Sequence, residues 1–382
     1  MTLPLYMLWF LIAVAYFAAL TAVQIPLRKR RLVPLRILLA IVKILLGMTA
    51  ANLVMIQDIG YHYWLCYVLT ACHIALYGDA LGDLLILPFV ISGKRDSYAK
   101  PQCVLCAALA LSYLIYGTVN MQLVTADRFT IRSDKVTDSK RIVFVSDLHV
   151  GSSQSLATTE KTIRSIAAEE PDLVLLGGDI VDEYTTKEEM NWVFSQFGAL
   201  DAPVYYIYGN HDRQDQHDLT VGAFFTPEDL ENALQVSGLR VLRDEWCRFS
   251  EDLVILGRED ITRPERLPLA EIEPRPEDAF VLLVDHAPYQ TEEIEQSGAD
   301  LQLSGHSHAA QLFPLRVLYD LTGYEACGFY QHGTTTLYVS PGASGWCMPF
   351  RSEKRCSYAV ISLEPETDRS DAAAVQEMAS SS

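Results

Sequence analysis

IVFVSDLHVG, residues 142–151, is the stretch of sequence that decides the fold. Its β-branched and aromatic residues predict a buried strand, which delivers Asp147 and His149 at its carboxyl end. In an open α/β sheet, ligands bind at that end of the strands. Side chains two residues apart on an extended chain point to the same side, so this carboxylate and imidazole can share one cation. Asp-x-His alone is a weak signal, and its meaning depends on the residues at the ends of the other strands.

Four later apolar runs also end in residues that bind metals, each beside a glycine or another small residue. They are 173–176, followed by Asp179; 204–208, followed by Asn210, His211 and Asp212; 280–284, followed by His286; and 301–303, followed by His306 and His308. Five of the seven histidines beyond the first third of the chain stand at these strand ends. Any one of them would most simply be a hydrogen-bonded structural histidine, but the repetition over five strands indicates a metal site.

Helices alternate with these strands in the first half of this region. Helical spacing is found in three segments, 157–169, 187–197 and 227–236, and several short strands come after them in 239–256. That order predicts an α/β domain, a two-sheet β-sandwich flanked by helices. We place this domain at 141–366, after a linker and edge strand at 125–140. The polar, Ala/Ser-rich tail at 367–382 is expected to be disordered.

Charge is unevenly distributed along the chain. Its 382 residues suit two structural units, and they include 48 acidic and 30 basic residues. The first 125 residues hold four acids and nine bases, which leaves 44 acids and 21 bases, a balance of −23, for the rest. A surface this acidic repels phosphate backbones, so no nucleic-acid partner is expected.

Four apolar segments within residues 1–124 predict a four-helix transmembrane region. They are 3–25, 37–56, 63–91 and 103–124. A cleaved signal peptide is disfavoured, because no positive charge precedes the first segment. Basic residues gather in the loops after the first and third segments, whereas the loop after the second has none. The positive-inside rule therefore predicts a multi-pass cell-membrane protein whose later domain is extracytoplasmic.

Three charged residues, Lys43, Asp79 and Asp83, interrupt the predicted spans. Charges inside a membrane are costly, so these residues form either a polar functional site, as in a transporter, or an ion-paired lock that close packing at Gly78 and Gly82 assists. We favour the lock, because one base and two acids suffice for it. The sequence does not give the oligomeric state, nor the disulfide pairing of the four cysteines in the later domain: Cys247, Cys327, Cys347 and Cys356.

The kinds of ligand at the strand ends constrain the metal. Carboxylate, amide and imidazole ligands without thiolate suit Mn²⁺, Fe or Zn²⁺, and we take Mn²⁺ first. Two cations about 3.5–4 Å apart need a bridging ligand, which a carboxylate supplies and an imidazole does not. Such a pair lowers the pKa of a shared water and neutralises phosphate oxygens during in-line attack. The sequence therefore predicts two divalent cations and a phosphorylated substrate.

Taken together, the strand-end blocks resemble the calcineurin-like metallophosphoesterase superfamily over residues 141–363. The blocks are Asp147-Leu148-His149, Gly178-Asp179-Ile180-Val181-Asp182, Gly209-Asn210-His211-Asp212, His286 and Gly305-His306-Ser307-His308. The resemblance implies a first metal held by Asp147, His149, Asp179 and His308. It implies a second metal held by the bridging Asp179 with Asn210, His286 and His306. It also implies that His211 donates to the substrate phosphate or leaving oxygen, with Asp212 orienting the ring.

Within that superfamily, the chain looks most like the membrane-anchored bacterial phosphodiesterase-type branch. Related branches include hydrolases of the nucleotide-linked diacylglucosamine intermediate of lipid A synthesis. That branch usually has two glycines after the Gly-His-x-His block, whereas Ala309 and Ala310 stand here. Alanine disfavours a positive φ, so the backbone or the substrate fit is expected to differ at this point.

The sequence thus predicts a membrane-anchored dinuclear-metal phosphoesterase, acting on a phosphodiester or pyrophosphate of a small molecule, a membrane lipid or a cell-envelope precursor. The alternative is a non-enzymatic, metal-containing binding scaffold of the same fold.

Two further segments of the sequence each allow two interpretations. Arg213, Gln214 and His217 contact a second substrate group or form a solvated loop. The aromatic-rich segment 313–338 either lines the pocket and meets a lipid or aromatic leaving group, or packs on its own core.

Overall fold

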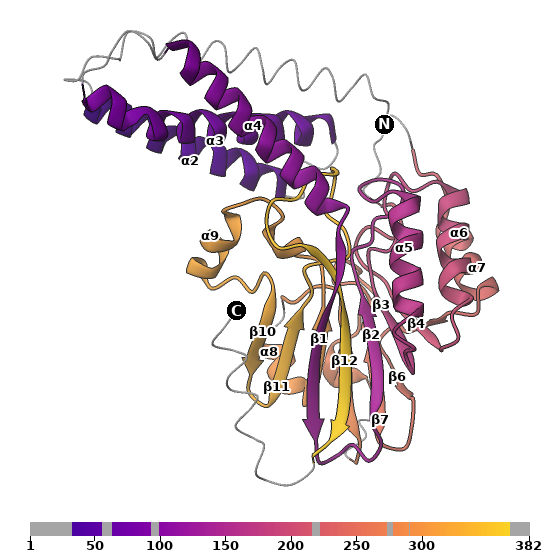
Figure 1. The fold of residues 1–382 in the computed structure, drawn as a ribbon. Helices are drawn as coiled ribbons and strands as arrows, with labels where there is room; N and C mark the ends of the chain where they lie inside the picture. Colours follow the sequence, from indigo (N-terminus) through magenta and orange to yellow (C-terminus); the bar gives the residue numbers. More distant parts are fainter. Residues whose placement is uncertain are drawn as a thin grey trace. The chain divides into compact units, whose positions relative to one another are not determined.

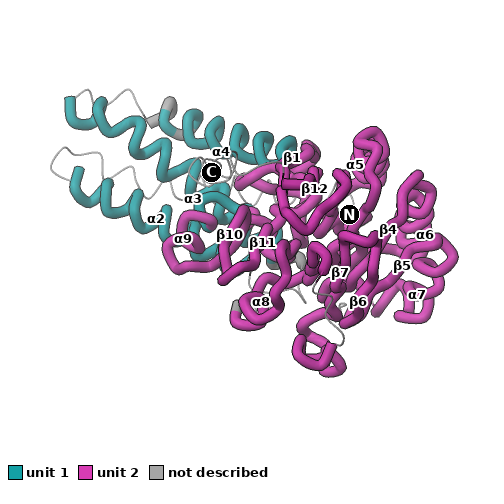
Figure 2. Tube along the Cα trace, turned by 90° about the horizontal axis from the view of Figure 1, so that it is seen from below, with its two compact units in different colours: residues 1–120, 312–315 teal, residues 121–311, 316–382 magenta. Residues whose placement is uncertain are grey.

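The computed structural model forms two compact units. It describes residues 33–55, 63–92, 99–215, 222–272, 278–289 and 291–366. Unit 1 comprises residues 1–120 with 312–315, and unit 2 comprises residues 121–311 with 316–382 (Figure 2).

Three helices in the described residues are long and apolar enough to cross a membrane. They are α2 (Val33–Met55), α3 (Tyr63–Ile91) and α4 (Ala99–Met121). They match three of the four predicted spans. The first predicted span, 3–25, lies outside the described residues, as do most of the basic residues that set the predicted orientation. The last helix begins and ends earlier than predicted, because α4 ends at Met121 and a strand begins at Val124.

The charged residues of the apolar helices pair with one another. Lys43 of α2 contacts Asp79 of α3 and lies 2.7 Å from Asp83, and all three side chains are buried. The Gln102 side chain of α4 donates to Asp83 at 2.7 Å. A Cβ at Gly78 would lie 2.9 Å from the Ala110 Cβ, so the glycine lets α3 and α4 approach closely. These contacts are those of the predicted ion-paired lock.

Unit 2 contains two six-stranded sheets with helices around them (Figure 1). The first has the order β1 (Val124–Ser133), β12 (Cys356–Pro365), β2 (Lys140–Val145), β3 (Leu173–Gly177), β4 (Val204–Ile207) and β5 (Arg240–Val241). The second has the order β10 (Gly328–His332), β11 (Thr335–Val339), β9 (Leu301–Ser304), β8 (Phe280–Val284), β7 (Leu253–Gly257) and β6 (Glu245–Arg248). The described helices are α5 (Leu156–Ala167), α6 (Lys187–Gly198), α7 (Pro227–Val236), α8 (Thr291–Ser297) and α9 (Leu315–Thr322).

Strand β2 shows why the two sheets pack face to face. Val143 and Val145 point into one apolar cluster, which includes buried residues of α5, α6 and α7. Ile142 and Phe144 point to the opposite face and join a second cluster with residues of β7, β8 and β9. Because alternate side chains of a strand lie on opposite faces, a continuous apolar run requires cover on both. The predicted two-sheet α/β sandwich is therefore confirmed.

Helices α6 and α7 begin at capping boxes that are visible in the sequence. Thr186 accepts from the Glu189 amide, and the Glu189 carboxylate accepts from the Thr186 amide; Thr226 and Asp229 do the same at α7. Each box satisfies amides that the first helical turn leaves unpaired. Figure 1 shows α5, α6 and α7 together along the first sheet, beside the ends of β3 and β4.

Parallel pairing brings the carboxyl ends of several strands to common edges. β2, β3 and β4 are parallel neighbours in the first sheet, and β7, β8 and β9 are parallel neighbours in the second. The residues just after these strands therefore gather in two neighbouring rows of loops, one from each sheet.

We expect the Asp252→Asn variant to be less stable at neutral pH. Asp252, just before β7, accepts from the Thr137 amide at 2.8 Å and from the Ser250 hydroxyl at 2.6 Å, and it pairs with Lys140 at 2.7 Å. Burial alone raises the pKa of this carboxyl, but these hydrogen bonds outweigh burial and hold the pKa well below its usual range. Losing charge-assisted hydrogen bonds costs about 2 kcal/mol, which lowers the unfolding midpoint by about 4–8 °C.

The effect should depend on pH in one direction. Because the folded-state pKa is depressed, the stabilisation is fully present above the unfolded-state value of about 4 and is lost as the pH falls below it. Thermal unfolding of the detergent-solubilised chain at pH 7 and pH 3 measures this. Asp278→Asn, at a side chain that is 79% exposed, serves as the control and should have little effect. If the unfolding midpoints of the wild type and the Asp252→Asn variant differed by the same amount at both pH values, the prediction would be contradicted.

Candidate metal centre

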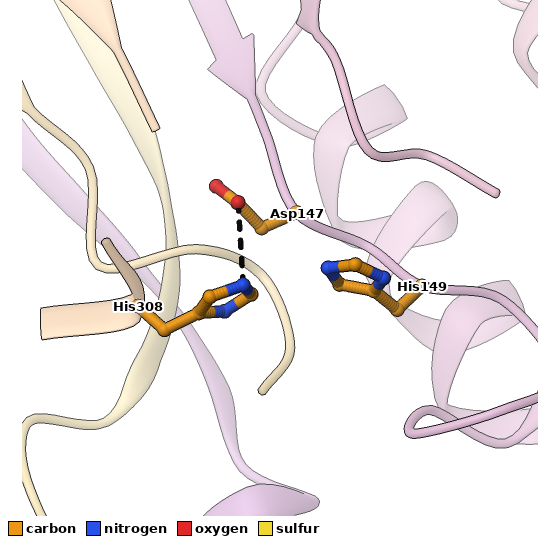
Figure 3. A group of neighbouring side chains, drawn as sticks. All are labelled: Asp147, His149 and His308. Carbon is orange, nitrogen blue, oxygen red and sulfur yellow. Dashed lines mark ion pairs between the residues drawn. The ribbon is translucent and has the colours of Figure 1, made fainter. Parts of the chain in front are cut away.

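Asp147, His149 and His308 form the first group of ligand atoms (Figure 3). Asp147 and His149 follow β2 of the first sheet, whereas His308 follows β9 of the second. One ligand atom from each of the three lies within 4.8 Å of the others, and His308 Nε2 lies 3.5 Å from Asp147 Oδ1. All three residues are at most 3% exposed. Both sheets are therefore needed to assemble this group.

The backbone of this group differs from the predicted extended chain. β2 ends at Val145, and Asp147 (φ 55°) and His149 (φ 45°) adopt left-handed conformations. The amides of Leu148 and His149 donate to the Asp179 carbonyl at 2.8 and 3.1 Å, which holds the loop in this shape. Left-handed conformations of non-glycine residues cost about 1–3 kcal/mol each and persist where the surroundings enforce them. Asp147 and His149 meet through this turn, and the expectation that an extended strand aligns them is wrong.

A second group consists of Asp179, His286 and His306. They follow β3, β8 and β9, so this group also draws on both sheets. His286 Nε2 lies 3.0 Å from Asp179 Oδ2, and His306 Nδ1 lies 2.9 Å from the side-chain oxygen of Asn210. Asp179 Oδ2 is also 3.9 Å from His149 Nε2 in the first group. The Asp179 carboxylate therefore lies between the two groups, where a bridging ligand is needed.

Two glycines allow the loops to come this close. A Cβ at Gly178, which has a φ of +85°, would lie 2.5 Å from the Gly209 amide nitrogen and 2.8 Å from His286 Nδ1. A Cβ at Gly305 would lie 2.5 Å from the Ser146 hydroxyl. Any side chain at either position would push the strand-end loops apart, so glycine is required in both blocks.

The buried donor atoms of these groups fit divalent cations. Asp147 Oδ2 and His149 Nε2 are buried and have no hydrogen-bond partner among the described residues. Such atoms are rare in folded proteins unless an ion or water satisfies them. Burial lowers the pKa of His306 to about 3 and holds that of His308 well below its usual range, so these two rings are neutral. Nearby carboxylates outweigh burial and raise the pKa of His149 and His286, whose rings must lose that proton to bind a metal. The oxygen and nitrogen donors, without thiolate, suit hard or borderline cations.

His211 lies beside the two groups, and Glu183 holds its ring. The Glu183 carboxylate lies 2.8 Å from His211 Nδ1, and both side chains are buried. Burial lowers the pKa of His211, but the carboxylates of Glu183 and Asp179 outweigh burial and raise that pKa to about 10. The ring is therefore a charged imidazolium whose Nδ1 donates to Glu183, which leaves Nε2 as the second donor.

Asp212 does not take the orienting role that the resemblance implied. Its carboxylate accepts from the amides of Gly209, Asp179 and Ile180 at 2.7, 2.8 and 2.9 Å. It thereby ties the loop after β4 to the loop after β3. The two carboxylates point in different directions. The Asp212 side chain turns back toward backbone amides, whereas Glu183 reaches His211 from the neighbouring loop. Glu183 was missed, because its contact with His211 joins two separate loops and no local pattern signals it.

Two further residues that hold the ligands were also missed. Asp182 belongs to a strand-end block but had no predicted role; it lies 3.0 Å from His149 Nδ1 and so directs Nε2 toward the first group. Arg351 is fully buried and donates to the carbonyls of His308 and Ser344 at 2.9 and 2.8 Å. Its sequence position, far from every block, offered no signal.

The alanines after His308 adopt the backbone that glycine favours. Ala309 has a φ of 48° and Ala310 a φ of 61°. Left-handed alanine costs about 1–2 kcal/mol, and here the turn is enforced by packing, since both residues are completely buried. Both alanines therefore adopt the positive φ that alanine disfavours.

Arg213 and Gln214 have partners in the structure. Arg213 pairs with Glu259 at 2.8 Å and stacks over the Tyr208 ring at 3.6 Å. The buried Gln214 side chain donates to the Asp182 carbonyl at 2.8 Å. Neither belongs to a solvated loop, and His217 lies outside the described residues. The four cysteines of unit 2 named above are buried free thiols.

Comparison with known proteins agrees with this geometry. Residues 140–310 match the family model of the calcineurin-like phosphoesterase. A Helicobacter pylori protein described as an uncharacterized metallophosphoesterase is 30% identical over 245 residues, which are 61% of this chain and 62% of that one. A zebrafish (Danio rerio) transmembrane protein with a metallophosphoesterase domain is 25% identical over 323 residues, which are 78% of this chain and 71% of that one.

These matches identify the class of the domain: the chain contains a calcineurin-like metallophosphoesterase domain, as the strand-end blocks predicted. The chain spans 62% of the length of the Helicobacter relative. Among solved structures, one from Thermus thermophilus aligns with a TM-score of 0.36 at 12% identity, over 54% of this chain and 90% of that one.

Proposed function

We propose that this protein is a membrane-anchored, metal-dependent phosphoester hydrolase. The observation that carries the proposal is the position of Asp179, whose Oδ2 lies 3.0 Å from His286 and 3.9 Å from His149, between two groups of buried ligands. In this proposal Asp147, His149 and His308 hold one cation, Asn210, His286 and His306 hold the other, and Asp179 bridges them. When bound, two divalent cations supply a water of lowered pKa and neutralise phosphate oxygens.

The residues beside the metal ligands position and protonate the substrate. Glu183 occupies His211 Nδ1, so Nε2 of the charged ring donates to a phosphate oxygen. The same Nε2 proton passes to the leaving oxygen as the phosphoester bond breaks. Asp182 keeps His149 in the tautomer whose Nε2 faces the first group. Arg351 and Asp212 hold the loops that carry His308 and Asp179.

We extend this proposal to the substrate, the metal and the membrane topology. The substrate is a phosphodiester or pyrophosphate of a small molecule, membrane lipid or cell-envelope precursor, a choice supported by the three apolar helices of the same chain. Mn²⁺ is the first candidate metal, with Fe or Zn²⁺ as alternatives. The protein is multi-pass in the cell membrane with an extracytoplasmic catalytic domain, which rests on the basic loops of the sequence. A non-enzymatic binding scaffold is disfavoured, because every ligand of the family pattern is present.

A comparison of two chromogenic substrates tests the proposed function. Detergent-solubilised full-length protein should hydrolyse bis(p-nitrophenyl) phosphate faster than p-nitrophenyl phosphate when Mn²⁺ is present. Excess EDTA should abolish both reactions, and added Mn²⁺ should restore them. If neither substrate is hydrolysed, the metal content of the same sample, measured by mass spectrometry, is needed to interpret the result. Activity that persists without metal would refute the proposal. Inactive protein that retains no metal after purification without chelators would favour a non-enzymatic binding scaffold that lacks the cations.

A further inference from the structure

Strand β7 ends, like the strands that carry the proposed metal ligands, in a loop with acidic residues. We call residues 258–266 the β7 loop. β7 and β8 are parallel neighbours, and the Arg258 amide donates to the Val284 carbonyl at the end of β8 at 3.0 Å. Because parallel strands end at the same edge of a sheet, the β7 loop begins beside the loop that carries His286, a proposed ligand of the second cation.

Two buried ion pairs hold the β7 loop in place. Glu259 pairs with Arg213, from the loop after β4, through two hydrogen bonds of 2.9 and 2.8 Å. Arg266 donates to Asp285, the residue before His286, at 3.1 and 2.6 Å. The four side chains are at most 10% exposed. Paired hydrogen bonds of this kind fix geometry, so the β7 loop is fixed against the loops that carry the ligands.

Asp260 of the β7 loop is buried without a basic partner among the described residues. It is 1% exposed, and its Oδ1 accepts from the Thr262 amide at 2.9 Å and from the Thr262 hydroxyl. Its Oδ2 is buried and has no hydrogen-bond partner in the described part of the chain, as is also the case for Asp147 Oδ2 at the first group. The Asp260 carboxylate interacts electrostatically with the His286 ring. A buried carboxylate oxygen left in this way indicates an ion or a water in the bound protein.

The two proposed cations receive unequal negative charge from their surroundings. The first has Asp147 to itself, and Asp182 stands behind its histidine ligand at 3.0 Å. The second shares Asp179 and otherwise has only neutral ligands, and the group behind His286 is the Gly177 carbonyl at 2.8 Å. A divalent cation in a buried site needs compensating negative charge nearby. The second cation therefore lacks a carboxylate of its own.

We propose that the Asp260 carboxylate supplies the negative charge that the direct ligands of the second cation lack, and that it thereby sets the affinity of that site. This inference rests on the two-cation centre of the proposed function and adds to it a residue from outside the ligand set. The compensation is mutual, because the cation also offsets the cost of a buried carboxylate that no basic side chain pairs.

Mn²⁺ titrations of metal-free protein, followed by calorimetry, test the inference. Full-length protein in detergent is stripped with EDTA and dialysed, and the wild type is expected to bind two ions. Asp260→Asn keeps the shape of the side chain and can still accept from Thr262. It should weaken one Mn²⁺ site by about 10–100-fold, the usual cost of losing a partner outside the direct ligands, and leave the other unchanged. Asp278→Asn, at a side chain that is 79% exposed, is the matched control and should change neither site.

Two ligand variants identify the site that Asp260 affects. His308→Ala removes a ligand proposed for the first cation alone, and in that protein Asp260→Asn should still weaken the remaining site. Asn210→Ala removes a ligand proposed for the second cation alone, and in that protein Asp260→Asn should leave the remaining affinity unchanged. The reverse pattern would overturn the inference, and so would equal weakening of both sites or of neither.

Thermal unfolding of the same samples gives a second measurement. Without metal, Asp260→Asn protein should unfold at the wild-type midpoint or above it, because the substitution removes an uncompensated buried charge. Added Mn²⁺ should then raise the midpoint less than in the wild type. A metal-free variant that is less stable than the wild type, or that does not fold, would show that the protein itself compensates Asp260 and would overturn the inference.

These measurements involve no substrate, so they separate the inference from the proposed function. A protein that hydrolyses phosphodiesters but whose Mn²⁺ affinities do not respond to Asp260→Asn keeps the proposed function and overturns the inference. A protein in which Asp260→Asn weakens the second site alone supports the inference, even if no chromogenic substrate is hydrolysed. A protein that binds no Mn²⁺ overturns both.

Discussion

Asp179→Asn should lower kcat for bis(p-nitrophenyl) phosphate by at least about 10³-fold, because the proposed bridging carboxylate is lost. The substitution keeps the shape of the side chain and can still accept from the His211 amide, which donates to Asp179 Oδ1 at 2.9 Å. It removes the negative charge that lies between His149 and His286. The bound metal should therefore fall below two ions per chain, which mass spectrometry of the purified protein measures.

A matched control accompanies this measurement. Asp278→Asn removes a carboxylate whose side chain is 79% exposed, and it should leave both activity and metal content unchanged. Asp179→Asn protein with two bound metals and activity within tenfold of the wild type would refute the bridging role. Circular dichroism of the variant separates a lost metal from a lost fold.

His211→Asn should lower kcat by about 10²–10⁴-fold and leave the metal content at the wild-type level, since general acid catalysis contributes an effect of this size. His211 is not among the proposed metal ligands, so the variant should lose activity because the proton donor is missing, while the cations stay bound. A variant that loses metal in parallel with activity would show that His211 supports the ligands instead.

The same experiment tests Glu183 as the residue that positions His211. Glu183→Gln should lower kcat by about tenfold, because a neutral amide holds the imidazolium less strongly than a carboxylate at 2.8 Å. Since Glu183 is proposed to act through His211, the double variant Glu183→Gln/His211→Asn should be no slower than His211→Asn alone. Additive losses would assign Glu183 a role of its own.

Much of the fold could be predicted from local pattern. The helix at 227–236 was predicted with the bounds of α7, and strands 280–284 and 301–303 match β8 and β9 to within a residue. These elements are signalled by features a few residues long, such as the Thr226 capping box and short apolar runs bounded by turns. The two-sheet arrangement was also predictable, because strands that are apolar throughout must be covered on both faces.

The candidate site was predictable in composition and less so in arrangement. The structure brings together all seven proposed ligands in two adjoining groups, as the resemblance implied. The structure differs from the prediction in two respects: Asp147 and His149 have a left-handed backbone, and the residue that holds the His211 ring is Glu183. Both differences depend on hydrogen bonds between separate loops, which no local pattern encodes.

By itself, the sequence determined which side chains end the strands, which segments are apolar enough to span a membrane, and that oxygen and nitrogen ligands for two cations are present. Only the tertiary structure decided that Asp179 lies between the two groups and that Arg351 holds the turn after His308. The physical reason is the range of the interactions. Strand and helix formation depend on neighbouring residues, whereas the position of a carboxylate between two sheets depends on the packing of strands more than a hundred residues apart.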